Sequence, residues 1–311
     1  MPTISVVIPT FNGGSLFAEV LAGLRRQRVE SPVELLIIDS GSTDDTLAAA
    51  RQAGARVVQI PQSEFDHGLT RNWGIELTTG EIVVLLTQDA VPADEYLMAN
   101  LIKPFEDPRV AGAFARQIPR AEHDVLVKRN IQNWIAGGPK GRVVQIENRE
   151  TYERMSPIER YLFCVFDNVC SAVRREAWRE VAFRQNAFGE DIEWSKRALE
   201  AGWKIAYEPT AAVVHSHSRS ARYEYKRTYM GHRTLYRLFG LATVPERKYV
   251  WRSLVAGVMQ DAKYVMQHEQ QWGKRLSLLA RLPALSWSSV MGQYRGARDE
   301  RLGRGKRQKG I

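Results

Sequence analysis

A carboxylate and two imidazoles each follow an apolar run in this sequence. Asp89 comes shortly after the run Ile82–Leu86. His215 and His217 come directly after the run AVV. One carboxylate, together with substrate phosphates and water, can hold a hard divalent cation such as Mg²⁺ or Mn²⁺. Side chains alternate along a strand, so both imidazoles share a face and either can add a second ligand. These residue types are able to hold a cation, and an ordinary surface His-Ser-His segment is the alternative.

An acidic pair stands where a helix is expected to begin. Glu190 and Asp191 open an amphipathic pattern that ends near Gly202. The positive end of the helix dipole favours ionised carboxylates, which is the state that a general base needs. The pair is therefore suited to act as a base, and simple capping of the helix is the alternative.

These residues need a scaffold that brings strand ends together. Strand and helix patterns alternate from the start of the chain, with strands expected at 4–9, 33–38, 55–60 and 82–86 and helices at 15–27, 46–53 and 67–78. The alternation predicts an α/β protein with a Rossmann-like, mostly parallel sheet flanked by helices. Such sheets bind ligands at the carboxyl ends of their strands. Neither GxGxxG nor GxxxxGK(S/T) follows the first strand, which argues against a dinucleotide-binding domain or a P-loop.

Several motifs occur in an order that identifies a resemblance. They are SVVIPTFNGG, LLIIDSGSTDDT, HGLTRN, LLTQDAVP, FDNVCSAVRREAW, FGEDIEWSKRALEAGW and VVHSHS. This ordered set, over about residues 3–220, resembles the family 2 glycosyltransferases, which have the GT-A fold. HGLTRN, TQDA, FDNVCSAVRREAW and HSH together are most similar to the bacterial rhamnosyltransferase branch of that family.

The resemblance implies that a nucleotide-sugar donor binds at the first strand ends. Asp39 would accept hydrogen bonds from the base or ribose, and Gly41 would let the backbone approach closely. Arg71 would pair with the diphosphate. The implied donor-binding residues are Pro9, Thr10, Asn12, Asp39, Ser40, Gly41, Arg71, Gln88 and Asp89. The structural alternatives are an Asx turn at Asp39, a capping box of Ser42 and Asp45, and a solvated helix arginine.

The resemblance also implies catalytic, metal-binding and acceptor-binding residues. Asp191 would take the proton from the acceptor hydroxyl, and Glu190 would orient the site. Asp89 corresponds to the acidic metal-binding motif, although Gln88 and Ala90 flank a single Asp where the family shows Asp-x-Asp. The implied metal ligands are Asp89 with His215 or His217, and the implied acceptor-binding residues are Asp167, Asn168 and Arg116, with Gln117 as a further candidate. Core packing explains the apolar neighbours of the acceptor segment equally well.

The composition is that of a folded protein with a substantial core. The chain has 311 residues, 44% of them apolar, and no apolar run of bilayer-spanning length. A strand pattern begins at residue 4 with no basic segment before it, so we expect no signal peptide. The expected location is cytoplasmic, either free or peripheral on the inner face of the cell membrane. Cys164 and Cys170 are expected to be buried free thiols.

The net charge of +9 comes from the last third of the chain. Residues 219–311 carry 20 Lys or Arg and 6 Asp or Glu, whereas residues 1–218 carry 24 and 29. We expect a GT-A domain over 1–218 and a basic, helical carboxyl-terminal extension over 219–311. Helices are expected at 223–239 and 248–268, followed by an apolar segment at 276–291 that Arg281 and Pro283 interrupt, and by a disordered tail from 295.

Tryptophans accompany the cations of this extension. Trp251, Trp272 and Trp287 suit helices that lie in an anionic membrane interface. A homo-oligomer interface explains them nearly as well. A nucleic-acid partner would rest on the basic tail alone and is not expected.

Together these patterns predict an inverting, metal-dependent glycosyltransferase. The best single donor is dTDP-L-rhamnose, and the expected acceptor is a saccharide, free or linked to a polyprenyl diphosphate, in cell-surface polysaccharide synthesis. One alternative is the same fold with a UDP-hexose donor. The other is a non-catalytic protein that binds a nucleotide sugar, which the full set of Asp89, Asp191 and His215 disfavours.

Overall fold

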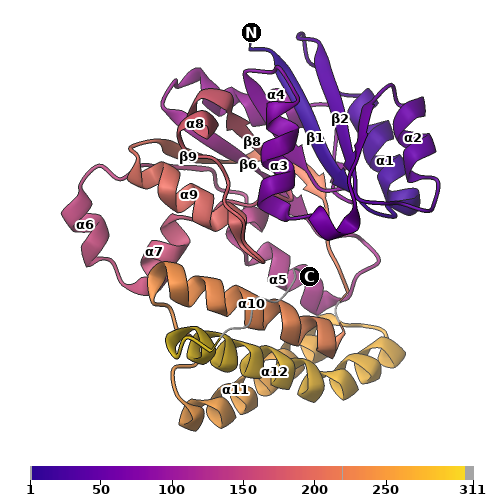
Figure 1. Cartoon of the computed structure of the whole chain (residues 1–311). Coiled ribbons are helices and arrows are strands. Elements are labelled where there is room, and N and C mark those ends of the chain that lie inside the picture. Colours follow the sequence, from indigo (N-terminus) through magenta and orange to yellow (C-terminus); the bar gives the residue numbers. More distant parts are fainter. Residues whose placement is uncertain (1, 219, 305–311) are drawn as a thin grey trace.

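The computed structural model describes residues 2–218 and 220–304. Strands and helices alternate as far as the fourth strand (Figure 1): β1 (Ile4–Thr10), α1 (Gly14–Arg25), β2 (Val33–Asp39), α2 (Thr46–Gln52), β3 (Arg56–Gln59), α3 (His67–Glu76) and β4 (Ile82–Leu86). The elements from there to the last strand are β5 (Val91–Pro92), α4 (Leu97–Ile102), β6 (Val110–Ile118), α5 (Val125–Gln132), β7 (Arg142–Val144), α6 (Arg149–Arg154), α7 (Pro157–Phe163), β8 (Cys170–Arg174), α8 (Arg175–Glu180), α9 (Glu190–Glu200) and β9 (Lys204–Val214). Three long helices follow: α10 (Ala221–Phe239), α11 (Arg247–His268) and α12 (Trp272–Arg301).

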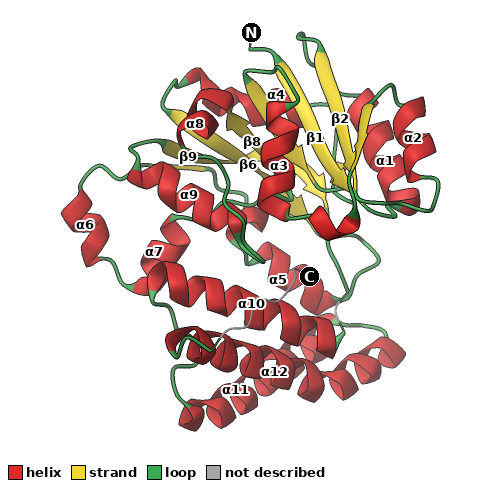
Figure 2. Ribbon diagram, viewed as in Figure 1, coloured by secondary structure: helices red, strands yellow, loops and turns green. Residues whose placement is uncertain are grey.

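All of these strands join one sheet, which the helices of the first 214 residues surround (Figure 2). Its order is β3-β2-β1-β4-β8-β6-β9-β5, with β7 paired to β9. The strands β3, β2, β1 and β4 run parallel, as the alternation with helices predicts. Beyond β4 the regular alternation is lost and the pairing becomes mixed, because β8 runs antiparallel to both β4 and β6. The predicted α/β fold is confirmed: the half of the sheet made of β3, β2, β1 and β4 is wholly parallel, and the other half is mixed.

β4 is the central strand that the apolar run at 82–86 predicts. It lies between β1 and β8, and all five of its side chains are buried. Val83 and Leu85 face one core cluster, which also contains Trp194 of α9. Val84 and Leu86 face a second cluster, which contains Phe17 of α1. Because the strand is covered on both faces, its carboxyl end is held rigidly beside the residues that follow it.

A bulge separates two registers between β6 and β9. Ala115 pairs with Glu208, but the next residue of β6, Arg116, pairs with Ala212. Residues 209–211 are therefore an insertion in β9 relative to β6. After the bulge the strands pair regularly up to Ile118 and Val214, and the backbone N–H of His215 donates to the Ile118 carbonyl at 2.9 Å. This fixes the place of the two histidines that follow β9.

The last three helices lie on the side of the sheet toward which the carboxyl ends of β1 and β2 point (Figure 1). Leu235 and Phe239 of α10 belong to the main core cluster, so this helix packs against the sheet-forming part. Gly292 and Gly296 of α12 lie against the backbone of α10. The domain boundary near residue 218 remains a prediction, and β9 ends four residues before it.

Two expectations for this region were wrong. The apolar segment at 276–291 is not broken, because α12 runs for 30 residues with Pro283 inside it. The tail is not disordered from residue 295, because residues 295–301 form the last turns of α12. Arg233 of α10 holds Glu300 there at 2.8 Å, which ties these turns to α10. Residues 305–311 lie outside the described part of the chain.

The described part of the chain contains no helix with both the length and the apolar composition that spanning a bilayer requires. Cys164 and Cys170 are buried and free, as expected.

The contact between α10 and α12 yields a stability prediction. A methyl group at Gly296 would overlap the carbonyl oxygen of Tyr229, whereas one at Gly257 on α11 would meet open space. We expect Gly296→Ala to destabilise the protein by about 1–3 kcal/mol. Gly257→Ala, the matched control, should stabilise it by about 0.5–1 kcal/mol because alanine favours a helix. Urea unfolding of both variants checks this, and equal effects would contradict the packing described.

Candidate active site

The carboxylate of Asp39 closes the loop after β2. It is fully buried and accepts hydrogen bonds from Thr10 Oγ1 at 3.0 Å, from the Gly41 N–H at 3.0 Å and from the Ser42 N–H at 2.9 Å. Ser40 Oγ donates to the carbonyl of Thr10 at 3.0 Å. Gly41 has a φ of +95°, in the left-handed region that glycine tolerates best. Asp39 therefore shapes this loop, and its contact with a nucleotide remains a prediction.

The loop after β1 is held by two side chains that were expected to bind the donor. The Gln88 amide accepts from the Phe11 N–H at 2.8 Å and donates to the Phe11 carbonyl at 3.1 Å. Asn12 Oδ1 accepts from the Thr43 N–H at 2.8 Å. Pro9 is half-buried within β1. The predicted donor residues at these strand ends thus lie together, and the amides of Gln88 and Asn12 are used to fix the loops.

The three predicted metal ligands meet at one point. Asp89, His215 and His217 each offer a ligand atom, and these atoms lie within 4.8 Å of one another. Asp89 Oδ1 is 3.7 Å from His215 Nε2, and Asp89 Oδ2 is 3.2 Å from His217 Nε2. One carboxylate and two imidazoles form a donor set that suits Mn²⁺ or another divalent cation, with positions left for phosphate oxygens and water.

Gln117 sets the orientation of the buried histidine. Its Oε1 lies 3.0 Å from His215 Nδ1, and its Nε2 donates to Asp167 Oδ2 at 2.6 Å. An amide oxygen only accepts hydrogen bonds, so Nδ1 carries the proton and Nε2 of His215 keeps the lone pair that faces Asp89. This arrangement resembles the outer-shell partners that orient metal-binding histidines. The acceptor role considered for Gln117 is therefore replaced by a positioning role.

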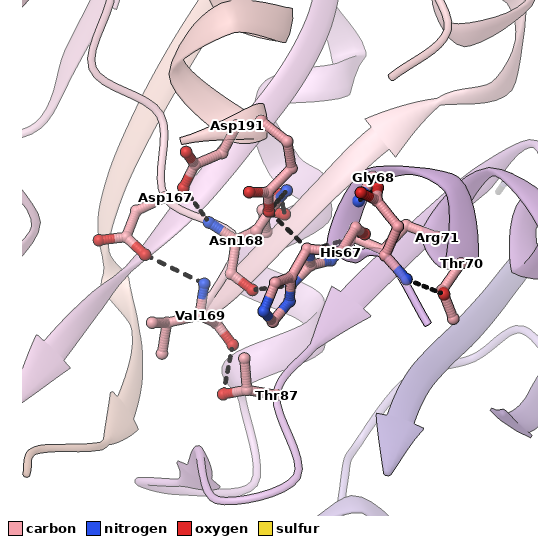
Figure 3. A network of polar contacts seen from close by, with 12 residues as sticks. His67, Gly68, Thr70, Arg71, Thr87, Asp167, Asn168, Val169 and Asp191 are labelled. Carbon is pink, nitrogen blue, oxygen red and sulfur yellow. Dashed lines mark hydrogen bonds and ion pairs between the residues drawn. The ribbon is translucent and has the colours of Figure 1, made fainter. Parts of the chain in front are cut away.

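A second cluster gathers carboxylates at the start of α9 (Figure 3). Gly189 precedes the helix with a φ of +79°, and Glu190 and Asp191 form its first turn. Asp191 Oδ1 accepts from the Ile192 N–H at 2.8 Å, and its Oδ2 accepts from the Asn168 N–H at 3.3 Å. Asp191 is only half-buried, so it remains accessible to a reacting hydroxyl.

The environment of this cluster changes its acidity. Burial raises the pKa of the Asp191 carboxyl well above its usual range, and the nearby carboxylates of Glu190 and Asp167 raise it further. Burial also raises the pKa of Asp167. A carboxyl with a raised pKa is a stronger base when ionised, which suits a general base.

Three predicted binding residues are committed to contacts within the protein. Arg71 is not exposed to a diphosphate, because its guanidinium is 3% exposed and pairs with Glu190 at 2.7 Å. The side chain of Asn168 is buried and accepts from Ser171 Oγ at 2.8 Å. Arg116 donates from Nε to the Gly137 carbonyl at 3.1 Å. Direct contact of Arg71 with the donor and of Asn168 with the acceptor is therefore corrected to a structural role, since both side chains are buried.

Residues that the sequence did not single out surround the histidines. Arg120 Nη2 donates to the backbone carbonyl of Asp89 at 2.7 Å. Ser216 is buried between the histidines and accepts from the Arg120 N–H at 2.9 Å. His123 Nδ1 contacts the same hydroxyl. In the sequence, only the polar Ser216 between the two histidines indicated that further polar residues would surround them.

A family model described as "Glycosyl transferase family 2" matches residues 5–182, more than half of the chain. The chain belongs to this family. Two relatives are the O-antigen chain rhamnosyltransferases RfbN of Salmonella typhimurium and WbaN of Salmonella anatum. RfbN is 31% identical over 72% of this chain and 69% of its own length. WbaN is 30% identical over 73% of this chain and 70% of its own length. The protein is accordingly a glycosyltransferase.

Solved structures agree on the fold. The mannosyltransferase PcManGT from Pyrobaculum calidifontis, in complex with GDP-Man and Mn²⁺, has a TM-score of 0.59 and 18% identity, over 93% of this chain and 87% of its own. Glucosyl-3-phosphoglycerate synthase from Mycobacterium tuberculosis has a TM-score of 0.53 and 21% identity, over 79% of this chain and 82% of its own. At these identities the likeness shows the GT-A fold alone, which the motif order predicted.

The raised pKa of Asp191 predicts an unusual stability profile. Between the unfolded value of about 3.9 and its raised folded value, the folded state binds more protons, so stability falls as pH rises. We expect Asp191→Asn to be more stable than the parent at neutral pH, with the difference vanishing near pH ~4. Urea unfolding across this pH range checks the sign.

Asp44 provides a control of opposite sign. Its hydrogen bond from Thr46 lowers its pKa, so its contribution is present at neutral pH and is lost as pH falls. Asp44→Asn should therefore be less stable than the parent at neutral pH. A parallel response of the two variants would contradict the electrostatic account of the Asp191 cluster.

Proposed function

We propose that this protein is an inverting, metal-dependent glycosyltransferase that transfers L-rhamnose from dTDP-L-rhamnose to a saccharide acceptor. The observation that carries the proposal is a continuous polar connection between two clusters. Asp89 faces His215, Gln117 joins His215 to Asp167, and Asp167 lies beside Asp191. A cation site and a base of raised pKa are the two parts that a single displacement at an anomeric carbon requires.

Asp191 acts as the base. Its carboxylate takes the proton of the acceptor hydroxyl while that oxygen bonds to the anomeric carbon, and the bond from this carbon to the diphosphate oxygen breaks. Asp89, His215 and His217 would hold Mg²⁺ or Mn²⁺, which supplies positive charge to stabilise the leaving nucleoside diphosphate. Attack from the face opposite the leaving group inverts the anomeric configuration.

Arg71 and Glu190 support the base without touching the sugar. Their ion pair holds Glu190 beside Asp191, where the charge of Glu190 raises the pKa of Asp191. Asn168 fixes the Asp191 carboxylate through its backbone N–H. Asp167 stays the candidate contact for the acceptor, because it is half-buried beside Asp191.

The choice of donor draws on the two rhamnosyltransferase relatives. A UDP-hexose is the alternative donor, since a solved structure of the same fold contains UDP-glucose and Mn²⁺. The proposed acceptor is a saccharide linked to a polyprenyl diphosphate, within cell-surface polysaccharide synthesis. Such an acceptor implies peripheral contact with the inner face of the cell membrane.

Nucleoside diphosphate release tests the proposal directly. The purified protein with Mn²⁺ or Mg²⁺ is incubated with dTDP-, UDP- and GDP-sugars, with and without a saccharide acceptor. We expect release from dTDP-L-rhamnose, lowered on the order of 100-fold in Asp89→Ala because the cation is lost. In Asp191→Asn, transfer to the acceptor should fall about 10²–10⁴-fold, as loss of a general base predicts.

Glu19→Gln on α1 is the control, since it removes an exposed carboxylate outside both clusters and should leave release unchanged. Release from a different nucleotide sugar would keep the enzyme class and overturn the choice of rhamnose. Full transfer by Asp191→Asn would contradict the role of Asp191 as the base. Absence of release and transfer with every nucleotide sugar, with or without acceptor, would favour a binding protein.

Gln117 gives a separate prediction about the cation site. Gln117→Leu removes the acceptor for His215 Nδ1, so the ring is no longer held in the tautomer that faces Asp89. We expect the affinity for Mn²⁺ in the presence of dTDP to fall about 10–100-fold, measured by calorimetry. Gln145→Leu, which removes an exposed amide bonded to the Gly202 carbonyl, is the control and should bind Mn²⁺ normally. Equal affinities would rule out the orienting role.

A further inference from the structure

We propose that the outer faces of α11 and α12 form a docking face for an anionic lipid bilayer. The docking face consists of Trp251, Met259, Met266, Trp272, Leu276 and Trp287, and their exposed fractions range from 47% to 68%. Monomeric proteins rarely leave so many large apolar side chains together on one side. The inference deepens the proposed function and rests on it in one respect, since it says how the enzyme would reach a membrane-linked acceptor.

Helical spacing places these residues on one side of each helix. On α11, Trp251, Met259 and Met266 are eight and seven residues apart, which places them within about a quarter of the helix circumference. On α12, Trp272, Leu276 and Trp287 are four and eleven residues apart, so they also lie on one side of their helix. Each helix therefore has an apolar stripe along its exposed side.

Other residues of both helices are packed inward. Val265 of α11 clusters with Leu278 and Leu282 of α12 and with Leu126 of α5. At the other end, Val250 of α11 clusters with Val290 of α12. The two helices are therefore antiparallel neighbours. Substitutions on the docking face remove no side chain from these clusters.

The charge around the docking face is positive. From the start of α11 to the end of α12, residues 247–301 contain ten Lys or Arg and four acidic residues. Of the acidic residues, Glu269 is 8% exposed, and Asp261, Asp299 and Glu300 pair with Arg129, Arg298 and Arg233. Arg252 and Lys263 are exposed on α11 beside its stripe. An apolar face ringed by cations complements anionic headgroups and acyl chains.

The same charges disfavour a second copy of this chain as the partner. A symmetric dimer through the docking face would bring the cations of both copies together, and like charges at an interface repel. A bilayer also fits the position of the site. α11 and α12 lie on the side of the sheet toward which the carboxyl ends of β1 and β2 point (Figure 1), and α10 begins six positions after His215.

Co-sedimentation of the full chain with vesicles tests the inference. We expect binding to phosphatidylcholine vesicles that contain phosphatidylglycerol, weaker binding at high salt, and little binding to phosphatidylcholine alone. The double variant Trp251→Ala, Trp287→Ala should bind at least about tenfold more weakly. The double variant Arg252→Glu, Lys263→Glu should lose at least about tenfold, since each cation near an anionic surface contributes about fivefold.

Two control variants make equal changes elsewhere. Tyr96→Ala removes an exposed aromatic side chain before α4, and Arg26→Glu with Arg51→Glu reverses two exposed charges near α1 and α2. Both should bind the vesicles as the parent does. Binding that is absent, insensitive to anionic lipid, or weakened as much by the controls would overturn the inference. So would a dimer in sedimentation equilibrium that the tryptophan variants dissociate.

Turnover of soluble dTDP-L-rhamnose separates this inference from the proposed function. The docking variants should release nucleoside diphosphate as the parent does, because their substitutions lie outside the site. Turnover without vesicle binding would overturn the docking face alone. Vesicle binding without turnover of any nucleotide sugar would overturn the proposed function and leave the docking face standing.

Discussion

A buried ion pair between Arg71 and Glu190 joins α3 to α9 beside the carboxylate cluster. Its atoms are 2.7 Å apart, and the two residues are 119 positions apart in the chain. Removing one partner of such a pair leaves an uncompensated buried charge, at a cost of about 3–5 kcal/mol. The Arg71 guanidinium also donates to the carbonyl of His67, so it joins the start of α3 to the start of α9. The position of Asp191 depends on this joint.

The polar residues of the site come from both halves of the sheet. The parallel strands carry loops that Asp39 and Gln88 fix from within, and Asp89 follows β4 of the same half. The mixed half carries the histidines after β9 and the carboxylates near β8 and α9. Gln117 connects the two clusters, because its amide oxygen faces His215 and its amide nitrogen donates to Asp167. A change of charge at one cluster therefore has a direct path to the other.

The sequence predicts which strand ends carry chemistry, and the structure explains why it predicts less about individual contacts. The buried run before Asp89 and the helix that begins at Glu190 follow from local periodicity and capping, which neighbouring residues determine. The partner of Arg71 lies far along the chain, so its burial could not be read locally. The same holds for Gln117, whose role depends on the register of β6 with β9. The last turns of α12 are helical because Gly292 and Gly296 let α10 approach closely. The periodicity of one helix does not show such a contact with another helix.

The bulge in β9 makes the length of this strand a functional variable. Three extra residues lie between the partners of Ala115 and Arg116, an odd number in a structure whose side chains alternate every residue. If the deletion of one of residues 209–211 were absorbed by a one-position shift of the register after the bulge, His215 and His217 would turn to the other face, with Ser216 in their place. Surface turns commonly tolerate insertions and deletions, but at this turn a change of a single residue would exchange two imidazoles for a hydroxyl. Variation in chain length among relatives should therefore be suppressed here more strongly than variation in residue type.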